Sequence, residues 1–252
     1  MFDSYGPLCT EVYDFTKPVG HSINGDIEYY LARLANTKGK ILEAAVGSGR
    51  FLIPLLEQGL DVDGFDASSA MLDSCQKRCH ERHLSPRLYE ADFATFSFNQ
   101  VYEAIVVPTG SFCLIESLDD AQQTLLNFYQ HLEKNGRLII DLMLPSDWQT
   151  GTISTSTFSL SADEGILLEN KAIAIDWVEQ TTLSYLTYEK WRQGKQIASE
   201  LQKFCMRWYG LEEFKNMLEK IGFTAITCSA DYQYNQQPTS NHSIFTFEAI
   251  KK

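Results

Sequence analysis

Two glycines, Gly47 and Gly49, stand between an apolar segment and a segment with helical spacing in the stretch KILEAAVGSGRFLIPLLEQGLDVDGFDAS, residues 40–68. Glycine lets a backbone approach a ligand closely, and a helix that begins at such a turn offers unpaired N–H groups and partial positive charge. An acidic residue precedes the turn at Glu43, and another follows it at Asp66. These residue types at this spacing predict a ligand site rather than a plain tight turn.

Three classes of ligand use a turn of this kind, and the surrounding residues discriminate among them. A mononucleotide loop requires Lys and then Ser or Thr after the last glycine, where this chain has Arg50 and Phe51. A dinucleotide loop requires a third glycine, where this chain has Leu52. A loop for the sulfonium cofactor S-adenosylmethionine requires an acid that ends the first strand, small residues through the turn, and an acid that ends the next strand. The residues that meet these requirements in order are Glu43, Gly47, Ser48, Gly49 and Asp66.

Composition and charge exclude several classes of partner. The chain has 33 acidic and 21 basic side chains and a formal net charge of -12, which argues against nucleic acid or an anionic membrane as partner. The N-terminus lacks a basic region followed by an apolar one, and no apolar run approaches the roughly 18 residues of a membrane span. The six cysteines lack the regular spacing of a secreted scaffold. We therefore expect a cytoplasmic protein with reduced thiols, and the sequence leaves its oligomeric state open.

Predicted strands and helices alternate through the first part of the chain. Residues 1–39 predict a helical lead-in, in which Ser22 caps a helix and Gly39 ends it. Apolar runs then predict strands at 40–45, 61–65, 88–91, 104–107 and 137–143, and helical spacing predicts helices at 51–58, from Ser68 or Ser69 to 83, and at 117–133. This alternation predicts a parallel sheet with helices on both faces.

The pattern changes after Pro145. Residues 151–209 alternate and are rich in Thr, Ser, Ile, Tyr and Trp, which predicts three or four antiparallel strands. A helix at 211–221 and two strands, at 224–232 and 243–250, complete the chain. We therefore expect an N-terminal helical lid (1–39), a core (40–146 and 210–252) and an antiparallel β insertion (147–209) that serves as a substrate lid or a subunit contact.

The stretches LEAAVGSGR, VDGFDASSAMLDSC, YEADFATF, EAIVVPTGSFCLI and HLEKNGRLIIDLMLP resemble, in order and spacing, the motifs of class I S-adenosylmethionine-dependent methyltransferases. The resemblance covers about residues 40–145. It departs from the usual family motif at Ala45, where glycine is common and where many small-molecule members have alanine. The resemblance implies an α/β fold: a Rossmann-like, doubly wound, mostly parallel seven-stranded sheet with an antiparallel last strand, plus an inserted small antiparallel β subdomain.

The same resemblance implies a binding site for S-adenosyl-L-methionine. In the family, the acid that ends the second strand binds both ribose hydroxyls, a role that falls to Asp66. After the third strand, an acid hydrogen-bonds the adenine amino group and the next residue packs on the adenine ring. These roles fall to Asp92 and Phe93. The implied cofactor-binding residues are Tyr13, Glu43, Ala45, Gly47, Ser48, Gly49, Asp66, Ala67, Met71, Asp92, Phe93 and Pro108, the implied substrate contacts are Ser111 and Cys113, and no metal is implied.

The insertion and a lead-in with Tyr5 and Tyr13-Asp14 resemble a bacterial subgroup of small-molecule methyltransferases that includes N-methyltransferases of amino sugars. This resemblance implies methyl transfer to a small-molecule acceptor by in-line displacement, with nitrogen preferred and oxygen second. Tyr13 is the catalytic candidate, because its ring or hydroxyl can lie beside the sulfonium. Some relatives carry a histidine after the fourth strand where this chain has Cys113, so Tyr13, Glu116 and bulk water are the candidate bases.

Two other functions stay open from the sequence. A non-catalytic protein would bind S-adenosylmethionine without acceptor chemistry, and a nicotinamide-dependent oxidoreductase would need the dinucleotide glycine that the turn lacks. Arg50 either reaches the cofactor carboxylate or faces water. Cys75, Cys79 and His80 share helical spacing without a complementary ligand pair, which predicts a solvated or half-buried helix face rather than a metal site.

Overall fold

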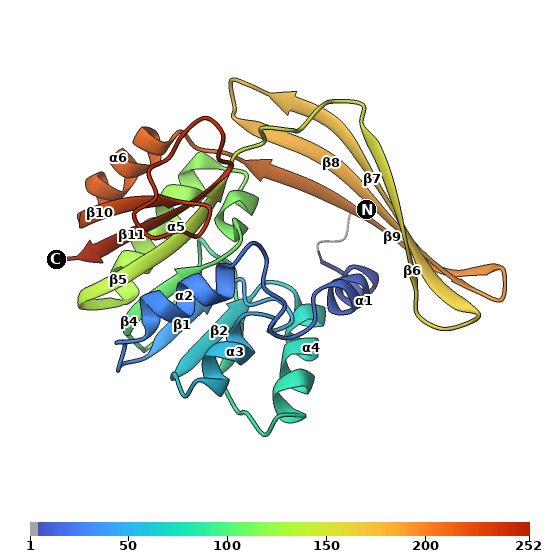
Figure 1. Cartoon of the computed structure of the whole chain (residues 1–252), viewed down its shortest axis with the longest axis horizontal. Helices are drawn as coiled ribbons and strands as arrows, with labels where there is room; N and C mark the ends of the chain where they lie inside the picture. The colour runs from blue at the N-terminus through green and yellow to red at the C-terminus, as the bar shows by residue number, and fades with distance from the viewer. Residues whose placement is uncertain (1–4) are drawn as a thin grey trace.

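A seven-stranded sheet forms the core of the molecule (Figure 1). The structure is a computed structural model that describes residues 5–252, so the first four residues of the expected lid lie outside the described residues. The strand order is β10-β11-β5-β4-β1-β2-β3, in which β1 pairs in parallel with β2 and β4, and β11 is antiparallel to β5 and β10. The predicted α/β fold is confirmed. The strands are β1 (Ile41–Ala44), β2 (Val62–Asp66), β3 (Leu88–Glu90), β4 (Tyr102–Val107), β5 (Leu132–Met143), β10 (Phe223–Ala230) and β11 (Ile244–Lys251).

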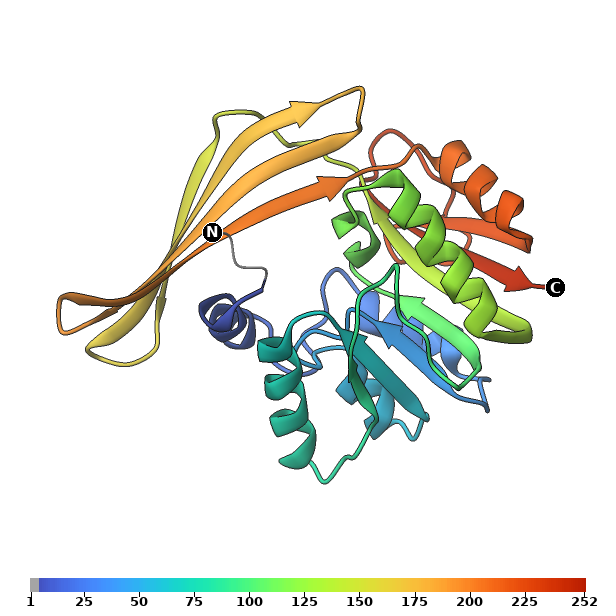
Figure 2. The ribbon, with the colours of Figure 1, turned by 180° about the vertical axis from the view of Figure 1, so that it is seen from behind.

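Helices cover both faces of this sheet (Figures 1 and 2). On one face lie α2 (Asp26–Leu34), α3 (Leu52–Glu57) and α4 (Ser69–His80), and on the other lie α5 (Leu118–His131) and α6 (Leu211–Ile221). Along β4, Ile105 and Val107 pack with α5, while Ala104 and Val106 pack with α2 and α3, because successive strand residues point to opposite faces. A strand buried on both sides needs an unbroken apolar run, which AIVV supplies. Within residues 5–252, no helix combines the length and apolar character needed to cross a membrane.

A separate four-stranded antiparallel sheet follows β5 and extends away from the core (Figures 1 and 2). Its hairpins are long, and the last one turns through Gln193 and Gly194, whose φ angles are 50° and 74°. Two positive φ angles are what a two-residue hairpin loop requires. The strands, in spatial order, are β6 (Ile153–Ser159), β7 (Glu164–Asp176), β8 (Thr181–Arg192) and β9 (Lys195–Arg207).

The first helix, α1 (Pro7–Thr16), lies between α4 and this inserted sheet (Figure 2). An apolar cluster joins the three elements, and its buried members are Leu8, Cys9, Val12, Met71, Ile166 and Tyr188. Glu200 of β9 accepts hydrogen bonds from the first-turn N–H groups of Leu8 at 2.8 Å and Cys9 at 3.2 Å. A carboxylate at this end of a helix satisfies free donors and opposes the positive end of the helix dipole.

The predicted cap at Ser22 is wrong, because α2 begins four residues later. Gly25 precedes the helix with a φ of 89°, a conformation that suits glycine. The Asp26 carboxylate accepts hydrogen bonds from the backbone N–H groups of Ile23 at 2.7 Å and Ile27 at 2.8 Å. Asp26 therefore organises the start of α2 from within its first turn.

The other predicted caps are confirmed, because Ser68 accepts from the Met71 N–H and Ser117 accepts from the Asp120 N–H. Both helices end two or three residues earlier than predicted, α4 at His80 and α5 at His131. After α5 the chain enters β5 directly, so the residues of the predicted last turn belong to the strand.

We expect the Glu200→Gln variant to loosen α1 on the inserted sheet, because the charge that faces the helix N-terminus is lost while the side chain keeps its shape. The cost should be about 1 kcal/mol, which corresponds to roughly fivefold faster amide hydrogen exchange in the first turn of α1. Glu169→Gln, on the opposite face of the sheet, is the matched control. Equal exchange rates in α1 of both variants would contradict the assigned contact.

Candidate active site

The carboxyl ends of β1, β2 and β4 meet where the strand order reverses, the edge at which open α/β sheets bind ligands. The Val46 N–H donates to the Phe65 carbonyl at 2.9 Å and so ties the turn after β1 to β2. Gly49 has a φ of 82°, and a Cβ there would lie 2.8 Å from the Cys75 sulfur. Ala45 also has positive φ, 57°. The turn is therefore held by the strand behind it and by α4 beside it.

Asp66 lies at the end of β2 beside the turn. One carboxylate oxygen accepts from the Gly47 N–H at 2.8 Å, and the other accepts from the Ser68 N–H at 2.9 Å. Burial raises the pKa of Asp66, while these backbone donors act in the opposite direction. The two bonds fix the carboxylate next to the glycine turn, so the structure brings Asp66 and Gly47 together as the sequence predicts.

Glu43, on β1, is the second acid at this edge. Its side chain is 1% exposed, and its Oε2 atom has no hydrogen-bond partner among residues 5–252. Burial raises the pKa of Glu43 well above the ordinary range for a carboxyl, and the neighbouring Asp66 charge acts in the same direction. Because an unpartnered buried carboxyl is costly, this position suits a ligand that offers a cation or a hydrogen-bond donor.

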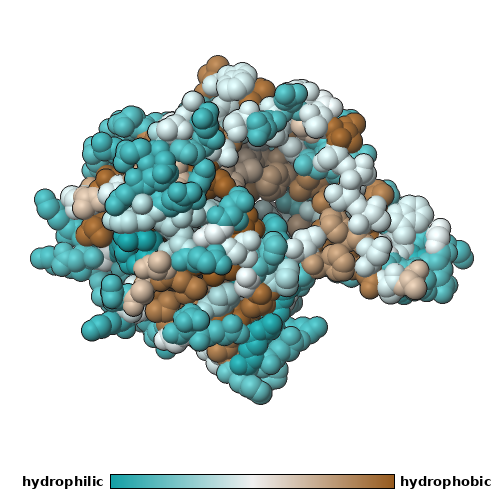
Figure 3. All heavy atoms as spheres, in the orientation of Figure 1, coloured by the Kyte–Doolittle hydropathy of each residue, from teal (hydrophilic) through white to brown (hydrophobic). Residues whose placement is uncertain are grey.

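The open side of the turn is at Gly47. Its φ is 54°, and a Cβ built there would meet no atom of the described residues within 4 Å. A hollow lies between the core and the inserted sheet in the space-filling view (Figure 3). An open glycine turn between an orphaned Glu43 oxygen and the Asp66 carboxylate fits a ligand with a cationic group and hydroxyls.

Ser48, between the two glycines, points away from this open side. It is fully buried, and Arg78 of α4 donates to its hydroxyl at 3.0 Å. The same guanidinium forms an ion pair with Asp14 of α1 at 3.0 Å. Arg78 therefore joins the glycine turn to α1, a link that the sequence interpretation missed.

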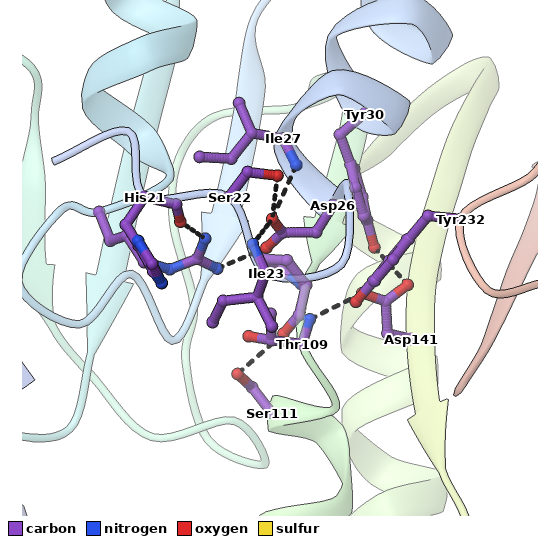
Figure 4. A network of polar contacts seen from close by, with 12 residues as sticks. His21, Ser22, Ile23, Asp26, Ile27, Tyr30, Thr109, Ser111, Asp141 and Tyr232 are labelled. Atoms are coloured by element: carbon purple, nitrogen blue, oxygen red, sulfur yellow. Dashed lines mark hydrogen bonds and ion pairs between the residues drawn. The ribbon is translucent and has the colours of Figure 1, made fainter. Parts of the chain in front are cut away.

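Arg50 follows the turn and is buried, so the prediction that it could face water is wrong. Its guanidinium pairs with Asp26 at 2.6 Å and donates to the His21 carbonyl at 2.7 Å, contacts that belong to the network in Figure 4. Breaking a buried pair of this kind is strongly destabilising, because it leaves one charge uncompensated. The pair holds the start of α2 over the turn.

Tyr13 is brought by α1 toward the same charges. The Arg50 guanidinium, Glu43 and Asp26 all lie near enough to act on its hydroxyl electrostatically. Burial raises the pKa of Tyr13, so its hydroxyl stays neutral at ordinary pH. On the other side of the ring, the Lys17 ammonium lies 4.3 Å from the ring centroid.

The predicted adenine contacts occupy different environments. Ala67 and Asp92 are exposed, just after the ends of β2 and β3. The Asp92 carboxylate accepts a hydrogen bond from the backbone N–H of Ala94 at 2.9 Å. Phe93 packs edge-on against Phe65, with ring centroids 5.6 Å apart. Met71 is buried beneath α1 and the inserted sheet. The contacts of these residues with a cofactor stay predictions.

A buried carboxylate that the sequence interpretation missed positions the loop after β4. Asp141 of β5 accepts hydrogen bonds from Tyr30 and Tyr232 at 2.9 Å, and from Thr246 and the Thr109 N–H at 2.7 Å (Figure 4). Burial raises the pKa of Asp141 to about 6, although each of these bonds lowers it. In the sequence, this carboxylate could have been recognised as an acid inside the largely apolar strand RLIIDLML.

The loop itself carries the predicted residues Pro108 and Ser111, whose side-chain hydroxyl donates to the Pro108 carbonyl at 3.0 Å. Gly110 turns the loop with a φ of 71°, and a Cβ there would lie 2.8 Å from Met143. After it, the short 3₁₀ helix η1 (Ser111–Leu114) contacts β9. The loop after β4 is therefore fixed on one side by β5 and on the other by the inserted sheet.

Two further predicted residues lie away from this edge. Cys113 is fully buried in the core on the α5 side of the sheet, and burial raises its pKa to about 12. Glu116 is half exposed and forms an ion pair with Lys203 of β9 at 2.7 Å. Cys75 and Cys79 are buried under the turn, and no group of three His, Cys, Asp or Glu side chains within residues 5–252 could hold a metal ion.

Residues 41–136 match the family described as a methyltransferase domain. These residues therefore form a methyltransferase domain. Over 217 residues it is 25% identical to the glycine/sarcosine N-methyltransferase of Aphanothece halophytica, covering 82% of this chain and 74% of that protein. The methyltransferase is S-adenosylmethionine-dependent, and the glycine turn, Glu43 and Asp66 supply a site that fits this cofactor.

Solved structures share the whole fold of this methyltransferase. Their alignments with this chain include the inserted sheet. The sugar N-methyltransferase KedS8 from a Streptoalloteichus species superposes with a TM-score of 0.75 at 20% identity, over 100% of this chain and 97% of that one. The amino pentose methyltransferase CalS10 from Micromonospora echinaspora, solved with S-adenosylmethionine bound, gives a TM-score of 0.71 at 13% identity over the full length of both.

We expect Gly47→Leu to weaken S-adenosylhomocysteine binding at least roughly tenfold, because the side chain would fill the open side of the turn. Gly59→Leu is the matched control, since Gly59 also has positive φ and open space around its Cβ. Both substitutions should cost about 1–2 kcal/mol of stability through the left-handed backbone. Calorimetry measures the affinity, and wild-type affinity in both variants would contradict a cofactor site at the glycine turn.

We expect the buried Asp141 carboxyl to make the methyltransferase less stable as pH rises from about 4 to about 6. The folded pKa of about 6 lies above the ordinary value of 3.8, so the native state binds the proton more tightly over this range. Relative to Asp141→Asn, which cannot titrate, the wild type should lose up to about 3 kcal/mol of unfolding free energy across this window. Urea unfolding of both proteins at several pH values measures the difference, and parallel pH profiles would contradict it.

Proposed function

We propose that this methyltransferase transfers the methyl group of S-adenosylmethionine to a nitrogen atom of a small-molecule amine. The observation that carries the cofactor half is the orphaned Glu43 oxygen beside the open turn at Gly47. The names of similar proteins support the acceptor half, because a glycine/sarcosine N-methyltransferase, a sugar N-methyltransferase and an amino pentose methyltransferase all act on amines.

The chain's own residues would hold the cofactor by charge and by close backbone approach. Glu43 would accept from the ammonium of its methionine portion, and that positive charge would bring the pKa of Glu43 back down. Asp66 would accept from the ribose hydroxyls, while Asp92 and Phe93 would border the adenine. S-adenosylmethionine supplies an activated methyl group when bound.

Positioning accounts for the rest of the reaction. The enzyme has to align the lone pair of the amine behind the methyl carbon and keep water out. Tyr13, carried by α1 and lying near the Arg50 guanidinium, would border that space, and its neutral hydroxyl would orient the amine. Because the pKa of Tyr13 is raised, the hydroxyl is a poor base at neutral pH, and we propose that the amine proton passes to solvent.

The N-terminal helix and the inserted sheet would act as the lid. α1 contacts the core through Arg78 and the sheet through Glu200, so one helix fixes the distance between them. This arrangement would exclude water from the methyl-transfer space on one side while the other side admits the acceptor.

The test is methyl transfer from isotope-labelled S-adenosylmethionine to paired amines and alcohols: glycine with glycolate, and D-glucosamine with D-glucose. We expect label on the nitrogen of at least one amine, located by mass spectrometry. Asp66→Ala should lower S-adenosylhomocysteine affinity at least about tenfold, because a charged hydrogen-bond acceptor is lost. Asp61→Ala removes an exposed acid of the same segment and is the control. Label on oxygen alone, or on none of these compounds, would contradict the proposed acceptor class.

A further inference from the structure

The inserted sheet ends at an exposed strand edge, formed by β6 (Figure 1). The seven residues of β6 have the sequence ISTSTFS, which carries no charge. All of them except Phe158 are exposed, and Ile153, at the start of the strand, is 55% exposed. An exposed, uncharged edge strand is a template for pairing with another chain, and natural proteins usually block such edges. The edge of β6 therefore fits a partner strand.

The other edge strands in the described part of the chain are protected. β3 has only three residues, and β10 is distorted by a register shift between Thr224 and Thr227. β9 carries Lys195, Glu200 and Lys203, and it contacts α1 and η1. Short strands, bulges, charges and covering elements are the features that prevent pairing between sheet edges. β6 has neither a charge nor a register shift.

The ladder between β6 and β7 shows which backbone groups face outward. The Ala172 N–H donates to the Thr152 carbonyl at 2.9 Å, and the Leu160 N–H donates to the Glu164 carbonyl at 2.9 Å. Because hydrogen-bonded pairs alternate along an antiparallel ladder, the even-numbered residues of β6 bond to β7 and the odd-numbered residues point their N–H and C=O groups away from it. These outward groups have no hydrogen-bond partner within residues 5–252, and they belong to Ile153, Thr155, Thr157 and Ser159.

We propose that β6 pairs with β6 of a second copy of this chain. The two strands run antiparallel about Ser156, and the two four-stranded sheets become one continuous sheet. The outward residues are placed symmetrically about Ser156, so Thr155 of each copy stands opposite Thr157 of the other. A two-fold contact requires such a self-complementary surface, and this one supplies about eight backbone hydrogen bonds.

Charge favours a second copy as the partner. Each copy has a formal net charge of -12, so two copies repel one another except where they meet at an uncharged surface. In the proposed register only Ser, Thr, Ile and Phe side chains stand opposite one another, and no acid faces an acid. A basic peptide, by contrast, would find no acid on this strand.

An exposed aromatic side chain lies beside the same edge. Phe15 of α1 is 52% exposed and packs edge-on against Phe158 of β6, with ring centroids 6.1 Å apart. A strand paired with β6 would stand next to Phe158 and extend this apolar contact. Because α1 also carries Tyr13, the second copy would support the lid helix from the side of the sheet edge. This inference concerns assembly and does not depend on the methyl acceptor.

The experiment is sedimentation velocity of the full chain over a range of concentrations. A contact of one strand and one aromatic side chain is smaller than the interface of a permanent dimer, so we expect a dissociation constant of about 1–100 µM. Thr157→Pro removes an outward N–H and leaves the ladder with β7 intact, and it should weaken the dimer at least about tenfold. Thr157→Val keeps the N–H and the side-chain shape, so this control should dimerise as the wild type does.

Ser156→Cys tests the register by a second route. In the proposed pairing the two Ser156 residues stand opposite one another as a non-hydrogen-bonded pair, with Cα atoms about 4.5 Å apart, which is within the range of a disulfide. Oxidised glutathione should therefore link Ser156→Cys into a covalent dimer, in which the two thiols are oxidised to one disulfide and the glutathione disulfide is reduced to two thiols. Ser154→Cys, which would stand opposite Phe158, is the control and should stay unlinked on a non-reducing gel.

A wild type that stays monomeric up to about 500 µM would overturn the proposal, since this concentration exceeds the expected dissociation constant. So would a dimer of unchanged strength in Thr157→Pro, or equal crosslinking of Ser156→Cys and Ser154→Cys. Thermal unfolding and calorimetry with S-adenosylhomocysteine show whether each variant keeps its fold and cofactor site. If Thr157→Pro fails to fold, the crosslinking comparison alone decides between the paired edge and a free one.

Discussion

One buried carboxylate, Asp141, holds together the wall of the active site. It gathers donors from α2, the loop after β4, the loop after β10, and β11, so four segments converge on two oxygen atoms. Burial in a low-dielectric interior strengthens each of these bonds and makes an unpaired one costly. The loop that carries Pro108 and Ser111 is therefore not a free connection. Its position depends on Asp141, which also accepts a hydrogen bond from Tyr30, 111 positions earlier in the sequence.

Local patterns predicted most of the secondary structure, because strands and capped helices are decided by neighbours a few residues apart. The glycine turn, the caps at Ser68 and Ser117, and the antiparallel insertion are of this kind. The cap at Ser22 was a plausible local pattern, but Asp26 organises this helix start instead, because its carboxylate reaches the backbone N–H groups of Ile23 and Ile27 and a buried arginine. Propensity cannot weigh such alternatives, because the arginine comes from another element.

The polar contacts of the site were harder to predict for the same reason. Arg50 and Asp26 are 24 residues apart, and Arg78 reaches α1 across 64 residues. A sequence shows that such residues are charged, and it does not show which of them will be buried together. The strand-end acids Glu43 and Asp66 were predictable, because parallel strands bring their carboxyl ends to one edge and the sequence marks that edge with a glycine turn.

The packing of α1 against the inserted sheet also affects how the protein folds during its synthesis. The helix leaves the ribosome before its partners Tyr188 and Glu200, which are synthesised about 180 to 190 residues later. During synthesis the glycine turn and its strands can pair with one another while α1 still lacks the inserted sheet against which it packs. The nascent chain thus exposes an amphipathic helix until the inserted sheet emerges, and closure of the active site is a late event in the life of each molecule.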